Sequence, residues 1–102
     1  SLIYLWYSYR MTQLTITKSS KKDKRFKAVF KYDDGKTKTT NFGFKGGSTY
    51  IDHKDKKIRS AYRARHKKDL DTKDYQRAGY LSYYITWGDE TNLKDAIKSY
   101  LE

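Results

Sequence analysis

Alternation between apolar and polar residues predicts strands in the first half of the chain. Residues 26–32 show the two-residue period of a strand with one buried face. The apolar positions of this period are Phe26, Ala28, Phe30 and Tyr32. A shorter alternation covers 14–17, and the Thr-rich segment 37–42 has the composition of a returning strand. Between the two longer segments, 33–36 contains the Gly that a tight hairpin turn requires, so the pattern predicts a three-stranded antiparallel meander.

Apolar positions in the second half recur at helical spacing. We expect a first helix from about 53 to 67 with Asp52 as its N-cap, a second over 75–87, and a third over 92–101 capped by Thr91. The residues of the last two helices expected to face the core are Tyr80, Leu81, Tyr84, Ile85, Trp87, Leu93, Ala96, Ile97, Tyr100 and Leu101. Strands followed by helices predict an α+β fold, with a three-stranded meander and then about three short helices.

The first helix is predicted to be amphipathic, with a cationic outer stripe. Its inward face is expected to hold Ile58, Ala61, Tyr62 and Arg65. Its outer stripe is expected to hold Lys56, Arg59, Arg63 and Lys67. An acidic loop over 69–74 is expected to follow this helix.

Residues 1–10 differ in composition from the rest of the chain. They are rich in aromatic residues, they precede Met11, and they lack the basic start and the length of a signal peptide. Our preferred interpretation is that they are a non-native extension, and the alternative is an added edge strand. Residues 11–102 are then expected to form a single α+β domain.

The charge is strongly positive and unevenly distributed. The 102 residues carry a formal net charge of +11 and contain no Cys. Residues 18–68 hold 18 basic and 5 acidic side chains, whereas 69–102 hold 4 basic and 7 acidic ones. Such a distribution can steer an anionic partner to one side. The absence of Cys excludes disulfides and thiolate metal sites, and no apolar run approaches the roughly 20 residues of a membrane span.

The cations of the first helix are the strongest candidate for a binding site. Lys and Arg on one rigid face can neutralise phosphates and release counterions, which gives affinity without sequence specificity. The residues expected to contact nucleic acid are Lys45, Lys56, Arg59, Arg63, Arg65, His66 and Lys67. This face could be joined by further cations, namely Lys21, Lys22, Lys24, Arg25 and Lys27. The alternative is a merely solvated helix face.

The Gly-rich segment 43–48 allows two interpretations. It could cradle a phosphate with backbone N–H groups, or it could simply connect strand to helix through positive φ angles. It lacks the Walker A spacing. Phe42, Phe44 and Tyr50 flank this segment and could stack on exposed bases, or they could belong to the core.

Catalytic and metal-binding signals are weak. Only Asp52 or Asp55 could complete a metal site with His53, and capping is the simpler role for both carboxylates. No spacing links a Ser to a His and an orienting carboxylate, as nucleophilic catalysis requires. We therefore expect no enzyme activity, no metal and no cofactor, unless a pocket brings His53 or His66 to a carboxylate or Ser.

Several short motifs resemble those of one viral family. The segments concerned are 39–43, 50–55, 59–62, 65–66, 78–84 and 87–88, and the resemblance runs from about Lys24 to Tyr100. The chain resembles a family of short basic proteins encoded by large DNA viruses of algae and protists and by related marine viruses. The resemblance implies a viral setting, in the virion or the infected host cell, and transfers no active site.

These observations together predict a non-enzymatic, non-specific nucleic-acid-binding protein, with DNA as the first partner considered and genome packaging as a natural setting. The alternative is a minor structural virion protein whose cationic face meets an acidic protein. We expect neither a membrane nor a small-molecule substrate as partner, and the oligomeric state is left open.

Overall fold

The computed structural model describes residues 11–101, and side chains from residue 13 onward. The predicted extension over 1–10, and its alternative as an edge strand, lie outside the described residues. An antiparallel sheet in the order β1-β2-β3 comes first: β1 is Met11–Lys18, β2 is Lys24–Tyr32 and β3 is Thr37–Phe44. Gly35 adopts φ +85° in the turn between β2 and β3, so the predicted meander is confirmed.

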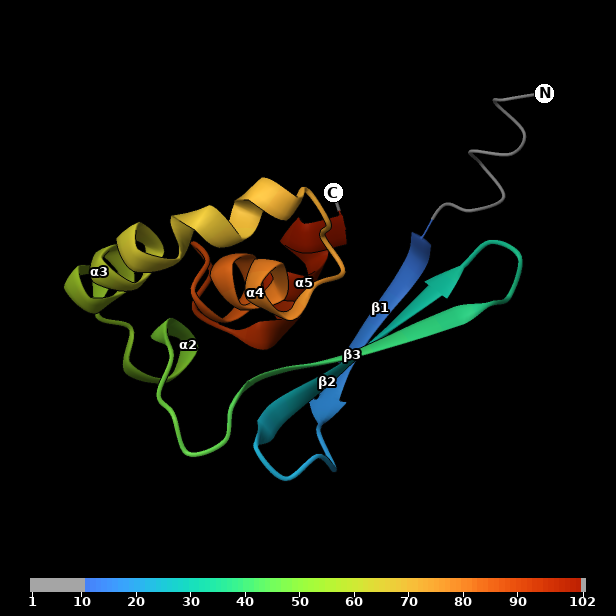
Figure 1. Cartoon of the computed structure of the whole chain (residues 1–102), viewed down its shortest axis with the longest axis horizontal. Coiled ribbons are helices and arrows are strands. Elements are labelled where there is room, and N and C mark those ends of the chain that lie inside the picture. Colours follow the sequence, from blue (N-terminus) through green and yellow to red (C-terminus); the bar gives the residue numbers. More distant parts are fainter. Residues whose placement is uncertain (1–10, 102) are drawn as a thin grey trace.

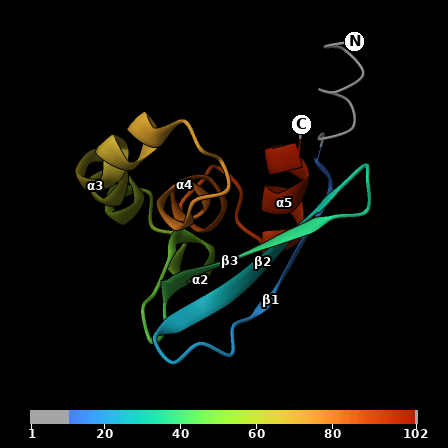
Figure 2. The same cartoon turned by 45° about the vertical axis from the view of Figure 1, so that its right-hand side comes forward.

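Short helical elements follow the sheet and lie together on one side of it (Figures 1 and 2). They are α2 (Tyr50–His53), α3 (Lys56–His66), the 3₁₀ helix η1 (Lys67–Thr72), α4 (Ala78–Leu81), the π-helix η2 (Ser82–Thr86) and α5 (Leu93–Leu101). The predicted α+β class is confirmed, although the helices are shorter and more numerous than the three expected.

The core lies between the aromatic face of the sheet and the C-terminal helices. Its buried members are Leu14, Phe26, Ala28, Phe30 and Phe42 from the sheet, with Leu81, Ile85 and Ala96 from α4, η2 and α5. The register aligns Phe26 with Phe42 and Leu14 with Phe30, which gathers the large side chains on one face. Two inward predictions are wrong, because Tyr84 and Leu101 are 43% and 39% exposed.

The helix starts differ from those predicted. Lys54 adopts a left-handed conformation (φ 57°) and separates α2 from α3, so no single helix covers 53–67. Asp55 caps α3 by accepting from the N–H groups of Lys57 and Ile58. Asp52 instead belongs to α2, where its carboxylate accepts from the Thr49 N–H at 2.8 Å.

Two other boundaries are also corrected. The predicted acidic loop over 69–74 is largely the 3₁₀ helix η1, and the second helix starts only at Ala78. Asn92 takes the place expected for Thr91, because its side-chain oxygen accepts from the Asp95 N–H at 2.9 Å. An amide oxygen at an N-cap performs the same task as a threonine hydroxyl.

Candidate nucleic-acid interface

Helix α3 is attached to the domain by polar and aromatic side chains. No residue of this helix is buried. Its inward side chains are Arg59, Tyr62, Arg63 and His66, at the spacing of one helical face. The Tyr62 ring lies between two others, stacked on Trp87 at 4.1 Å with an interplanar angle of 6° and on His66 at 4.1 Å.

The two inward arginines satisfy carbonyl groups at the end of η2. Arg63 Nε donates to the Trp87 carbonyl at 2.8 Å, and Arg59 Nη1 donates to the Gly88 carbonyl at 3.3 Å. Carbonyls at a helix C-terminus lack intrahelical partners, so these bonds replace water. Arg63 also contacts Asp89 at 2.9 Å and, by hydrogen bonding and charge, lowers the pKa of that carboxyl.

The predicted outer stripe is therefore wrong for Arg59 and Arg63. Ile58, expected inside, is 46% exposed, and Ala61 and Arg65, also expected inside, are exposed as well. A guanidinium can stack on a ring while it donates to a carbonyl, as Arg59 does over Tyr50 at 4.5 Å, and an isoleucine can do neither. The surface beneath α3 presents aromatic rings and backbone carbonyls, so the arginine face of the helix packs against it.

Seven exposed lysines form a surface that we call the basic end. They come from the turn between β1 and β2 with the first residue of β2, from the loop after β3 and from the segment that starts α3. The members are Lys21, Lys22, Lys24, Lys45, Lys54, Lys56 and Lys57. Figure 1 shows these three segments along one margin of the molecule, below and beside α2. Within the described part of the chain, none of the seven amines forms an ion pair.

Contacts between the three segments hold the basic end together. The Lys45 N–H donates to the Asp23 carbonyl at 3.2 Å, which joins the loop to the turn. The Arg25 guanidinium grips both oxygens of Asp52 at 2.6 and 2.7 Å, which fixes α2 against the start of β2. These contacts connect backbone segments that carry or adjoin the lysines.

The nearby carboxylates do little to offset these charges. Asp52 is paired with Arg25, whose hydrogen bond holds the pKa of the Asp52 carboxyl far below its usual range. Asp55 is engaged at the N-terminus of α3, where a negative charge meets the helix dipole. Within the three segments, Asp23 and Asp55 therefore accompany seven lysines, and the basic end keeps a strong positive field.

The seven residues predicted from sequence divide into three groups. Lys45, Lys56, Arg65 and Lys67 are exposed, and the first two belong to the basic end. His66 is half-buried and contacts Asp69 at 3.2 Å, while Arg59 and Arg63 point inward. Sequence reasoning missed Lys54 and Lys57, and it gave Lys21, Lys22 and Lys24 only a supporting role. The distribution of Lys and Arg in α3 was the available signal, because its lysines are exposed and its arginines point inward, with Arg65 as an exception.

One of the three candidate stacking residues is exposed. Phe42 and Tyr50 are buried, but Phe44 is 73% exposed at the end of β3, next to Lys45 and opposite Lys24 in the register. Phe44 borders a groove of about 510 Å³ whose other walls include Tyr62, His66 and Ser82. An aromatic ring beside free amines is a suitable platform for a base.

The Gly-rich segment has the geometry of a connection. Gly43 and Gly46 adopt φ of +80° and +91°, as a strand-to-helix link with tight turns requires. The Gly47 N–H donates to the Phe44 carbonyl, so this donor already has a partner in the chain.

The groove also brings His66, Asp69 and Ser82 together, which is the convergence that an enzyme would need. Among the described residues, however, no hydrogen bond links His66 to Ser82, and the His66 ring is stacked on Tyr62. The other imidazole, His53, accepts the Asp55 N–H at Nδ1. Across residues 11–101, no group of three or more His, Asp or Glu side chains could hold a metal ion. No helix in that range is long and apolar enough to span a bilayer.

The fold and this surface define a small α+β protein with a cationic end. Comparison with known proteins places it more closely: residues 14–66 match the family of unknown function DUF5754, and the chain belongs to this family. It is also 38% identical over 85 residues to the uncharacterized protein L851 of Acanthamoeba polyphaga mimivirus, covering 78% of this chain and 85% of the viral one. No solved structure matches the chain.

Proposed function

We propose that this protein binds nucleic acid through its phosphates, without sequence specificity and without catalysis. The supporting observation is the basic end, where seven exposed lysines are accompanied by two carboxylates, Asp23 and Asp55, while the neighbouring Asp52 is paired with Arg25. Phosphate contacts of this kind supply most of the affinity of non-specific binding.

The expected binding is steeply salt-dependent. If about six phosphates are neutralised, log K falls with log salt at a slope of roughly −5. A fourfold rise in salt, from 50 to 200 mM, then weakens binding about 1,000-fold. We take DNA as the first partner, and the exposed Phe44 ring adds a preference for strands with unpaired bases.

The viral relative supports a viral setting for this activity, and we propose genome packaging in the virion or the infected cell. The alternative, a structural virion protein that binds an acidic partner, uses the same amines. The two differ in the ligand, because an acidic polypeptide has a lower charge density than a duplex and no bases to stack on Phe44.

A salt titration with paired variants tests the proposal. The full chain is titrated into a labelled 20-base-pair duplex between 50 and 300 mM salt, and anisotropy gives Kd. Replacing Lys54, Lys56 and Lys57 by Gln removes three contacts of the basic end and should make the slope of log K against log salt shallower by about 3. The matched control replaces exposed Lys73, Lys94 and Lys98, which lie in the acidic third of the chain.

The control should retain the slope of the parent chain. A slope shallower than about −2 for the parent chain, or an equal loss of affinity in both triple variants, would contradict the proposal. Binding to polyglutamate without binding to the duplex would move the assignment to the acidic-protein partner.

A further inference from the structure

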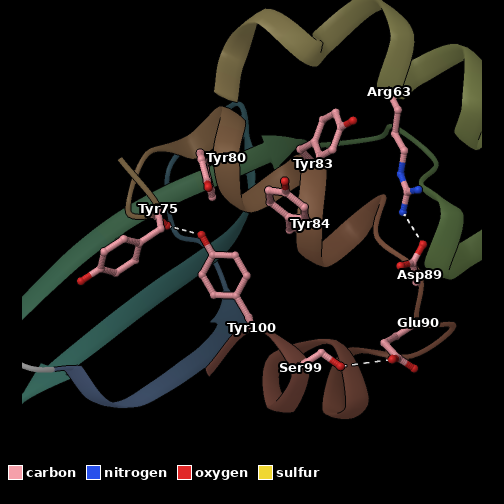
Figure 3. Close-up of a pocket in the computed structure, with 9 residues that line it drawn as sticks. All are labelled: Arg63, Tyr75, Tyr80, Tyr83, Tyr84, Asp89, Glu90, Ser99 and Tyr100. Carbon is pink, nitrogen blue, oxygen red and sulfur yellow. Dashed lines mark hydrogen bonds and ion pairs between the residues drawn. The ribbon is translucent and has the colours of Figure 1, made fainter. Parts of the chain in front are cut away.

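A second pocket, rich in tyrosine, lies beside α5 (Figure 3). Its volume is about 580 Å³. Five tyrosines from the loop before α4, from α4, η2 and α5 form much of its wall: Tyr75, Tyr80, Tyr83, Tyr84 and Tyr100. Arg63, Asp89, Glu90 and Ser99 close the other side (Figure 3).

Tyr84 stands in the middle of the aromatic wall. Its ring centroid is 5.2 Å from that of Tyr80 and 5.0 Å from that of Tyr83, yet the residue is 43% exposed. Rings left open to solvent in a pocket present π faces that attract cations. A guanidinium already uses this wall, since the Arg63 Cζ lies 5.8 Å from the Tyr83 ring centroid.

The charge of the pocket is complementary to a cation. Arg63 and Arg59 share the Asp89 carboxylate, at 2.9 and 3.8 Å, whereas Glu90 forms no ion pair among the described residues. Glu90 is held in place by the Ser99 hydroxyl, which donates to it at 3.1 Å. Burial, followed by the neighbouring tyrosines, raises the pKa of Tyr84. Glu90 is the carboxylate among the lining residues that no arginine contacts, so it supplies the negative charge for a bound cation.

We propose that this pocket binds an organic cation, an alkylammonium or guanidinium group placed between the tyrosines and Glu90. The aromatic wall and the carboxylate are the two elements that such a group requires. A Lys or Arg side chain of a basic polypeptide and a free polyamine share this chemistry. This inference does not rest on the proposed nucleic-acid binding, because the two sites share no residue.

The test is an NMR titration of the full chain with three small ligands. These are acetyl-Gly-Arg-Gly-amide, its citrulline counterpart, which is neutral and nearly isosteric, and spermidine. The Arg peptide should give saturable shifts of the Tyr84 and Ser99 signals at millimolar concentration, and the citrulline peptide should give none. Tighter binding of the Arg peptide than of spermidine assigns the site to a protein partner, and the reverse order assigns it to a polyamine.

Variants separate the site from the fold. Tyr84→Ala should weaken binding of the Arg peptide about two- to thirty-fold, while Tyr84→Phe, which keeps the ring, should stay within about twofold. Glu90→Gln should also weaken binding, and the urea midpoint of each variant reports whether the fold is retained. Equal binding of the citrulline peptide, or an unchanged Kd in folded Glu90→Gln, would overturn the proposal. Lys57→Gln should leave the Kd of the Arg peptide unchanged.

Discussion

Replacing Arg63 by Ala should destabilise the protein, because this side chain docks α3 onto the end of η2. The charged hydrogen bond to the buried Trp87 carbonyl is worth about 1.5–3 kcal/mol. The ion pair adds at most about 0.5 kcal/mol, because Asp89 is 83% exposed, and the Tyr83 contact adds about 0.5 kcal/mol. We therefore expect a loss of about 2–4 kcal/mol in the free energy of unfolding.

Urea unfolding followed by circular dichroism measures this loss. With an m-value of about 1.5 kcal/mol per M, the midpoint should fall by about 1.3–2.7 M. Arg63→Lys should recover less than half of the loss, because one amine cannot reach both the carbonyl and the carboxylate in the geometry of the guanidinium fork.

Arg65→Ala is the matched control, since Arg65 lies on the same helix but is exposed. Its free energy of unfolding should stay within about 0.5 kcal/mol of that of the parent chain. If Arg63→Ala and Arg65→Ala unfold at the same urea concentration, the docking role of Arg63 is refuted and the helix face predicted from sequence would stand.

Three further predictions concern other parts of the molecule. Asp52→Asn should lower the free energy of unfolding by about 1 kcal/mol at pH 7. Because the pKa of Asp52 is lowered in the folded state, the parent chain should lose this advantage as the pH falls below about 4. The urea midpoints of the two chains should then converge. Gly88→Ala should cost about 2–3 kcal/mol in thermal unfolding, since the new Cβ would lie 2.0 Å from the Tyr84 carbonyl oxygen. Gly35→Ala should cost only about 1 kcal/mol, because Gly35 has φ +85° but open space around it. Equal losses in the two variants would contradict this reasoning. Phe44→Ala should leave the melting temperature unchanged, because the side chain is exposed. It should weaken binding of a single-stranded oligonucleotide about five-fold or more and have little effect on binding of a duplex. An equal effect on both ligands would exclude base stacking.

The sheet and its buried face could be predicted from the sequence because their signals are local. A two-residue period over 26–32 and a Gly in the following turn determine strand, register and face together. The segregation of strands and helices then gives the α+β class. The predicted inward positions of α4, η2 and α5 were largely correct for the same reason, because large apolar side chains at helical spacing form one face that is usually buried.

The candidate site was harder to predict because its geometry depends on distant partners. The inward face of α3 is determined by the Trp87 and Gly88 carbonyls, which lie more than 20 residues away and leave no mark on the helix sequence. Asp52, the N-cap predicted from sequence, is likewise engaged by a distant partner, Arg25, 27 positions earlier in the chain. A helical charge pattern alone cannot distinguish an arginine that docks from a lysine that is solvated.

The attachment of α3 has a consequence for local unfolding. Since none of its residues is buried, the helix can leave the domain without opening the core around β2, and such a unit opens at a lower free energy than the whole protein. In heavy water, the backbone amides of residues 60–66 should therefore exchange well before those of residues 26–30, which wait for global unfolding. Each opening also releases two guanidinium groups from their carbonyl partners into solvent.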